Sequence, residues 1–162
     1  MWAISNAAAG TTKQKQMVAD AQIIPIVIHI LQNKSETLSI RRNGIWVVVN
    51  LLSEEDFCLT GNLVGHGIIP CLCEYLNSTD HTDEQLIRIL LEGLITLLDS
   101  TDEAESLHKQ TEARLCYIAG IRECGVEDTL DMLSYHETDF DEARYLLRML
   151  TTNGGENDMD DD

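Results

Sequence analysis

The sequence has few helix-breaking residues and few basic ones. Only two of its 162 residues are proline, aromatic residues make up 5%, and 11 Lys and Arg residues stand against 28 Asp and Glu residues. Because breakers are rare and Leu and Ile fill the apolar runs, the composition favours helices and argues against disorder for most of the chain. The net charge of −17 disfavours nucleic acid and anionic membranes and favours cationic partners. Solubility alone is the competing interpretation of this charge.

Patterns of disulfide, metal and catalytic sites are also missing. The five cysteines are an odd number within apolar helical pattern, so we expect free thiols in a reducing compartment. Cys71 and Cys73 point to different sides of a helix, so we expect buried thiols rather than a metal site with His66. No phosphate-binding glycine loop, catalytic carboxylate pair or activated serine is recognisable. We expect neither a cofactor nor an enzymatic activity.

Signals for membranes and secretion are likewise not found. No run of 18 uncharged apolar residues occurs, and the first residues do not have the pattern of a signal peptide. We therefore expect a soluble intracellular protein.

An apolar phrase recurs along the chain. Residues 20–25 (DAQIIP) and 65–70 (GHGIIP) each lead into an apolar run, with the two prolines 45 residues apart, and a fainter copy lies at 123–128. A period in the 40s without strand signals predicts helical repeats of the armadillo or HEAT type. In each clear copy the proline falls in the first turn of the next helix, where its missing N–H is not needed.

These repeats divide the chain into units of three helices. We expect residues 1–10 to form the last helix of a truncated repeat, and residues 11–53, 54–99 and 109–152 to form three armadillo repeats. An acidic loop (100–108) precedes the last repeat, and a disordered acidic tail (153–162) follows it. Thr82 is the expected N-cap of the long helix in the second full repeat. Because the first helix has no partner helices before it, we expect the chain to be a fragment or a truncated gene model.

Two of the long helices carry the pattern Trp-x-x-x-Asn. Trp2 and Asn6 form one pair, and Trp46 and Asn50 form the other. Residues four apart share a helix face, so each indole lies beside a carboxamide. An indole face attracts a cation and covers the aliphatic stem of Lys or Arg. The Asn amide can bond both the N–H and the C=O of an extended peptide.

The same pairs have a structural interpretation. Each Trp can belong to the core, and each Asn can hydrogen-bond a neighbouring helix. Two copies in register with the repeat favour peptide binding over this alternative. Counted from the prolines, the equivalent positions of the next repeat are Leu91 and Ile95, where the pair is lost.

Several segments together resemble importin α. Residues 2–10 resemble its Trp-x-x-Ser-Asn signature, and residues 67–72 resemble the start of one of its helices. Residues 91–94 resemble its ninth repeat, and residues 121–125 and 133–137 resemble its tenth and last repeat. The resemblance runs from Trp2 to about Leu150. It implies an all-α fold, an armadillo-repeat α-solenoid in which three-helix repeats form a right-handed superhelix.

The resemblance also implies a nuclear import adaptor. Importin α binds Lys/Arg-rich nuclear localisation signals of cargo proteins in a concave groove and shuttles between cytoplasm and nucleus. Its last repeats contact a nuclear export receptor, and importin β binds an N-terminal arm that would lie upstream of this chain. Carried over, Trp2 and Asn6 belong to the seventh repeat and Trp46 and Asn50 to the eighth, which form the minor cargo site.

Two features depart from the importin α pattern, and one of them is that residues 51–53 (LLS) follow Asn50 where the family has a turn of small residues. Asn43 stands three residues before Trp46, where the family commonly has an acidic residue, and Arg41 and Arg42 precede it. The acidic residues 54–56 either compensate for this loss or cap the next helix. The alternative function for the whole chain is a structural armadillo scaffold that docks proteins through its outer helices, without peptide binding in the groove.

Overall fold

The computed structural model describes residues 2–52, 56–78, 83–103, 107–136 and 138–151. Within these ranges the chain forms α-helices and one short 3-10 helix, and no strand. The elements are α1 (Trp2–Ala8), α2 (Thr12–Asp20), α3 (Ile23–Gln32), α4 (Leu38–Leu51), α5 (Phe57–Gly65), α6 (Ile68–Ser78), α7 (Glu84–Asp99), η1 (Ser100–Glu103), α8 (Leu107–Glu123), α9 (Glu127–Ser134) and α10 (Asp141–Thr151). The expected tail at 153–162 lies outside the described residues.

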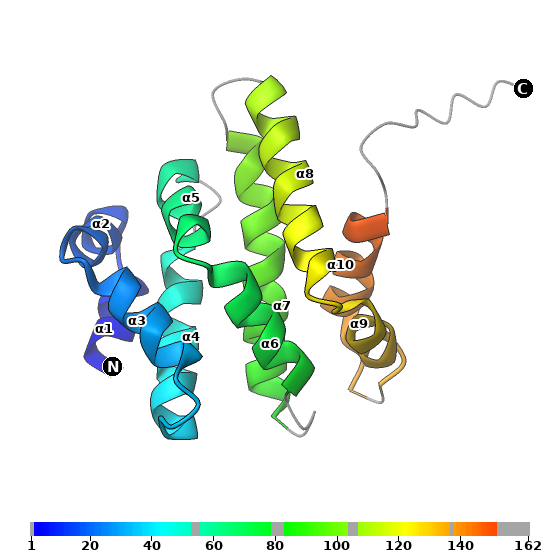
Figure 1. Cartoon of the computed structure of the whole chain (residues 1–162), viewed down its shortest axis with the longest axis horizontal. Helices are drawn as coiled ribbons and strands as arrows, with labels where there is room; N and C mark the ends of the chain where they lie inside the picture. The colour runs from blue at the N-terminus through cyan, green and yellow to red at the C-terminus, as the bar shows by residue number, and fades with distance from the viewer. Residues whose placement is uncertain (1, 53–55, 79–82, 104–106, 137, 152–162) are drawn as a thin grey trace, which may run out of the picture.

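The helices form three successive units, α2–α3–α4, α5–α6–α7 and α8–α9–α10, preceded by α1. The units follow one another along the long axis of the molecule (Figure 1). The third helices form a continuous row, because α1 packs against α4, α4 against α7 and α7 against α10. A row of equivalent helices gives equivalent positions of successive repeats a common face.

The joint between the first and second helix of each unit bends at one repeated position. Gln22, Gly67 and Gly125 occupy this position and all have positive φ, at 55°, 87° and 64°. They are the third residues of the three recurring phrases in the sequence. Glycine adopts this conformation without strain, whereas Gln22 adopts it with a side chain attached. The recurrence of the phrase therefore reflects a backbone turn that every repeat requires.

Polar side chains cap the long third helices. The Thr37 hydroxyl accepts a hydrogen bond from the Ile40 amide at 3.4 Å, and Asp83 Oδ1 accepts one from the Leu86 amide at 3.1 Å. The expected N-cap Thr82 lies outside the described residues, and Asp83 is the residue that caps α7. The two caps fix the registers of α4 and α7, which matters for the site below.

The core runs between the helix rows as one apolar cluster. Helix α7 lies in its middle, and its fully buried side chains recur at helical spacing: Ile87, Leu90, Leu91, Leu94, Leu97 and Leu98. In the described part of the chain, no helix is long and apolar enough to cross a membrane. Stability therefore comes mainly from burying aliphatic side chains between successive repeats.

Candidate functional site

Helix α1 presents the first Trp–Asn pair to solvent. The Trp2 side chain is 72% exposed, and Asn6, one turn later, is exposed as well. Ser5 and Ala8 are the residues of α1 that are buried. The indole and the amide of this pair are thus both accessible to a ligand.

Helix α4 places the second pair next to the first. Trp46 is partly buried and packs one side against the core cluster. Asn50 Nδ2 donates a hydrogen bond to the Ser5 backbone oxygen at 3.2 Å and lies 3.4 Å from Ser5 Oγ. Asn50 therefore tethers α4 to α1, which is the helix-to-helix role that the structural interpretation gives it. Among the described residues, no donor bonds its Oδ1, which remains available as an acceptor.

The structure corrects the equivalence that the prolines predict for α7. Leu91 has no exposed surface and belongs to the core. Glu92 follows the N-cap Asp83 by nine residues, just as Trp46 follows the N-cap Thr37 by nine. Glu92 is exposed and Thr96 is partly exposed, so these two residues occupy the places of Trp46 and Asn50. Counting from the prolines gives the wrong equivalence because the segment from Pro70 to the cap Asp83 is one residue longer than the segment from Pro25 to the cap Thr37.

Two arginines confirm this register. Arg42 follows Thr37 by five residues, and Arg88 follows Asp83 by five. Arg42 forms an ion pair with Asp83, at the start of α7. Arg88 does the same one repeat later, because its Nη1 lies 2.8 Å and 2.9 Å from the two carboxylate oxygens of Glu142, in α10. Arg42 of α4 and Arg88 of α7 thus each reach the start of the next third helix.

A close helix contact accompanies the change from Trp46 to Glu92. A β-carbon at Gly93 would lie only 2.9 Å from Val49 Cγ2, so α4 and α7 approach each other at the glycine. Glu92 is the neighbour of this glycine and faces away from the contact, toward solvent. The exposed row across α1, α4 and α7 therefore combines two indoles, two Asn amides and one carboxylate, which we call the groove row (Trp2, Asn6, Trp46, Asn50 and Glu92).

Asn43 and the acidic residues 54–56, which were expected either to compensate for it or to cap the next helix, can be placed only in part. Asn43 Nδ2 donates to the Ser39 backbone oxygen at 2.8 Å, within its own helix. Asp56 caps α5, because its Oδ1 accepts a bond from the Leu59 amide at 2.9 Å. Residues 54 and 55 lie outside the described part of the chain. Glu92 is the acidic residue that the structure adds to the row, because α7 is capped by Asp83, one residue after the expected cap Thr82.

The cysteines at the start of α6 are buried thiols. Cys71 and Cys73 are buried, and burial raises the pKa of the Cys71 thiol to about 11, with Glu74 adding to the effect. Burial also raises the pKa of Cys73. Both side chains are therefore neutral thiols near pH 7. The described residues contain no cluster of three or more His, Cys, Asp or Glu side chains that could hold a metal ion.

Comparisons with known proteins identify the fold. No protein-family model matches the chain. Over 87 residues, 54% of its length, the chain is 34% identical to importin subunit alpha-1b of Oryza sativa subsp. japonica, and it covers 15% of that protein. The designed armadillo repeat protein YIII(Dq)4CqI has a TM-score of 0.53 at 17% identity, over 91% of this chain and 73% of that one.

A second designed armadillo protein, YIII(Dq.V1)4CPAF, was solved in complex with the peptide (KR)4. Its TM-score is 0.50 at 18% identity, over 92% of this chain and 71% of the designed one. Together with the repeated helices, these likenesses show that the chain is an all-α armadillo-repeat solenoid.

Proposed function

We propose that the chain is a non-enzymatic receptor that binds Lys/Arg-rich nuclear localisation signals along its groove row, as part of a nuclear import adaptor of the importin α kind. The observation that carries this proposal is the pair of Trp-x-x-x-Asn motifs on adjacent third helices, with Trp2 72% exposed and Trp46 open on one side. If both tryptophans were core residues, the high exposure of the Trp2 indole would be unexplained.

The chemistry of the groove row fits an extended basic peptide. Each indole offers a flat, electron-rich face to the stem and charge of a Lys or Arg side chain. Asn6 and the Oδ1 of Asn50 can hold the peptide backbone, which fixes its position without reading its sequence. Glu92 continues the row with a negative charge, which attracts a cation and disfavours an acidic peptide.

The similarity to rice importin subunit alpha-1b supports the nuclear import assignment, and it covers a small share of that protein. The designed protein solved with (KR)4 supports the general idea that this fold can hold alternating Lys and Arg residues. Shuttling between cytoplasm and nucleus, and delivery through importin β, follow from the import proposal and not from the groove itself.

The test is a titration of a Lys/Arg-rich peptide. Trp46→Ala should weaken binding by about 2 kcal/mol, or about 30-fold, because buried aromatic anchors dominate such interfaces. Trp2→Ala should weaken binding with little effect on folding, since its indole is mostly exposed. Tyr135→Ala is the matched control, because Tyr135 is an 84% exposed aromatic residue in the last repeat. Unchanged affinity in both folded Trp variants would eliminate the groove as the binding site.

A structural scaffold is the second candidate, and the bond from Asn50 to Ser5 favours it. In that case the Trp–Asn pairs hold the repeats together, and partners dock on the outer helices. Trp46→Ala would then lower the melting temperature, and a basic peptide would bind neither form of the protein.

Contact with a nuclear export receptor is a further part of the import proposal. The exposed large side chains of the last repeat include three on α9, α10 and the turn between them, namely Met132, Tyr135 and Tyr145. Replacing the three with Ser should abolish binding to the purified export receptor and leave the peptide affinity of the groove unchanged. Full retention of receptor binding would remove the last repeat from the proposal.

A further inference from the structure

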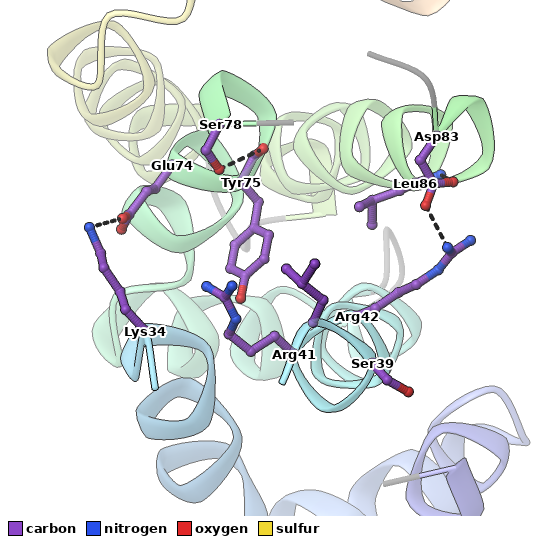
Figure 2. A pocket seen from close by; sticks show the side chains of 10 residues that line it. Lys34, Ser39, Arg41, Arg42, Glu74, Tyr75, Ser78, Asp83 and Leu86 are labelled. Carbon is purple, nitrogen blue, oxygen red and sulfur yellow. Dashed lines mark hydrogen bonds and ion pairs between the residues drawn. The ribbon is translucent and has the colours of Figure 1, made fainter. Parts of the chain in front are cut away.

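A hollow of about 740 Å³ lies between the first unit (α2–α3–α4) and the second (α5–α6–α7), and none of the groove-row residues line it. Its wall comes from the loop before α4, the first turns of α4, the end of α6 and the start of α7 (Figure 2). Lys34, Arg41 and Arg42 line it, together with the acidic residues Glu74 and Asp83. Three of the chain's 11 Lys and Arg residues therefore meet at one place, although the net charge is −17.

Two of these cations already have partners. Lys34 Nζ lies 2.9 Å from Glu74 Oε1, but both side chains are largely exposed, at 81% and 56%. Such a surface pair contributes little and opens readily. Arg42 is held by Asp83 and by a hydrogen bond to Gln85 at 3.2 Å. Its role as a link between α4 and α7 makes it a wall of the hollow rather than a free binding group.

Arg41 differs from its two neighbours. Its guanidinium lies over the Tyr75 ring, with Cζ 5.4 Å from the ring centroid, and Figure 2 shows the two side chains side by side in the hollow. No carboxylate among the described residues forms an ion pair with it, and its buried Nε has no hydrogen-bond partner. A buried N–H without an acceptor is unfavourable, so the free protein leaves this cation incompletely satisfied.

The partner chemistry follows from these groups. A guanidinium held beside an aromatic ring can present its planar N–H donors to a carboxylate or a phosphate, whose oxygens match the spacing of those donors. Lys34 can leave Glu74 at small cost and supply a second positive charge at the rim. Ser39 and Ser78 line the same hollow and add hydroxyl groups.

We propose that this hollow binds the oxyanion of a peptide side chain, with phosphoserine preferred over glutamate. Arg41 is the main binding group, Tyr75 holds it in place, and Lys34 adds charge. Phosphoserine is preferred because its two negative charges and three oxygens can engage both cations. The site is separate from the groove row and accepts the opposite charge, so its existence does not depend on binding in the groove.

The experiment uses peptides without Lys or Arg, so that the groove row is not engaged. Three fluorescein-labelled Gly/Ser peptides with phosphoserine, glutamate or serine at the centre are titrated into the full chain at low salt and followed by anisotropy. The expected order of affinity is phosphoserine, then glutamate, then serine. Arg41→Gln should weaken phosphoserine binding roughly tenfold, the usual size for one charge-assisted contact.

The controls separate a built site from the general field of the protein. Arg122→Gln removes the same charge from α8, where Arg122 pairs with Glu127 at 3.5 Å, and should leave phosphopeptide affinity unchanged. Arg41→Lys keeps the charge without the planar fork and should fall between wild type and Arg41→Gln, which also covers the case in which Arg41→Gln fails to fold. Equal binding of the phosphoserine and serine peptides, or equal losses in Arg41→Gln and Arg122→Gln, would overturn the proposal.

Discussion

The α1–α4 junction and the α7–α10 junction join equivalent helices with different side chains. At the first, the Asn50 amide bonds the α1 backbone, the Trp2 indole is exposed, and the Trp46 indole is partly exposed. At the second, Arg88 pairs with Glu142 and its Cζ lies 5.0 Å from the Phe140 ring centroid. A repeat junction can therefore be held by ion pairs at its rim. The exposed position of the third helix can then differ between repeats, as it does between Trp46 in α4 and Glu92 in α7.

The α4–α7 junction lies between these two and is the most sensitive to added volume. Gly93→Val places branched atoms against Val49, which a β-carbon alone would approach to 2.9 Å. Overpacking of this kind costs about 3 kcal/mol of unfolding free energy. The matched control is Gly120→Ala, whose β-carbon would lie 3.6 Å from Ile69 and which should stabilise its helix slightly. Denaturant unfolding measures both, and equal midpoints would show that α4 and α7 do not meet closely.

The arginine pairs give the next largest effect. Arg88→Gln should lower the free energy of unfolding by about 1.5 kcal/mol, because it removes charged hydrogen bonds to Glu142 and the contact with Phe140. Arg42→Gln should cost about 1 kcal/mol, because Arg42 lacks the aromatic contact. A double-mutant cycle of Arg88→Gln with Glu142→Gln tests the pair directly. A coupling energy near zero would mean that the pair does not hold the α7–α10 junction.

The two Asn residues should separate the structural role from the binding role. Asn50→Ala should lower the free energy of unfolding by about 1 kcal/mol, since it removes the hydrogen bond to Ser5. Asn6→Ala should leave stability nearly unchanged, because Asn6 is exposed. Thermal unfolding of both variants is the measurement. A larger loss of stability in Asn6→Ala than in Asn50→Ala would mean that Asn6, and not Asn50, has the structural role.

Glu92 carries the smallest expected effect. Glu92→Gln should weaken the binding of a Lys/Arg-rich peptide about threefold at low salt and hardly at all at high salt, because exposed charge pairs are screened. Glu112→Gln, on the exposed side of α8, removes the same charge outside the groove row and is the control. If the two variants lose the same affinity, Glu92 acts only through the net charge.

The fold follows from the sequence more completely than the site does. The recurring phrases predict three-helix repeats because each repeat needs a residue with positive φ at the same joint, as Gln22, Gly67 and Gly125 show. The register of α7 is harder to predict. One extra residue between Pro70 and Asp83 turns the helix by one position, which moves Leu91 into the core and Glu92 into the groove row. Motif spacing alone also does not reveal that Asn50 bonds α1, because this depends on the packing of two repeats.

Acrylamide quenching of Trp46 fluorescence in the Trp2→Phe variant, with and without a saturating Lys/Arg-rich peptide, tests directly whether the groove row binds a basic peptide. Acrylamide should quench Trp46 in the free protein, and the bound peptide should shield it. Quenching that is negligible without peptide, or that the peptide leaves unchanged, would contradict the account.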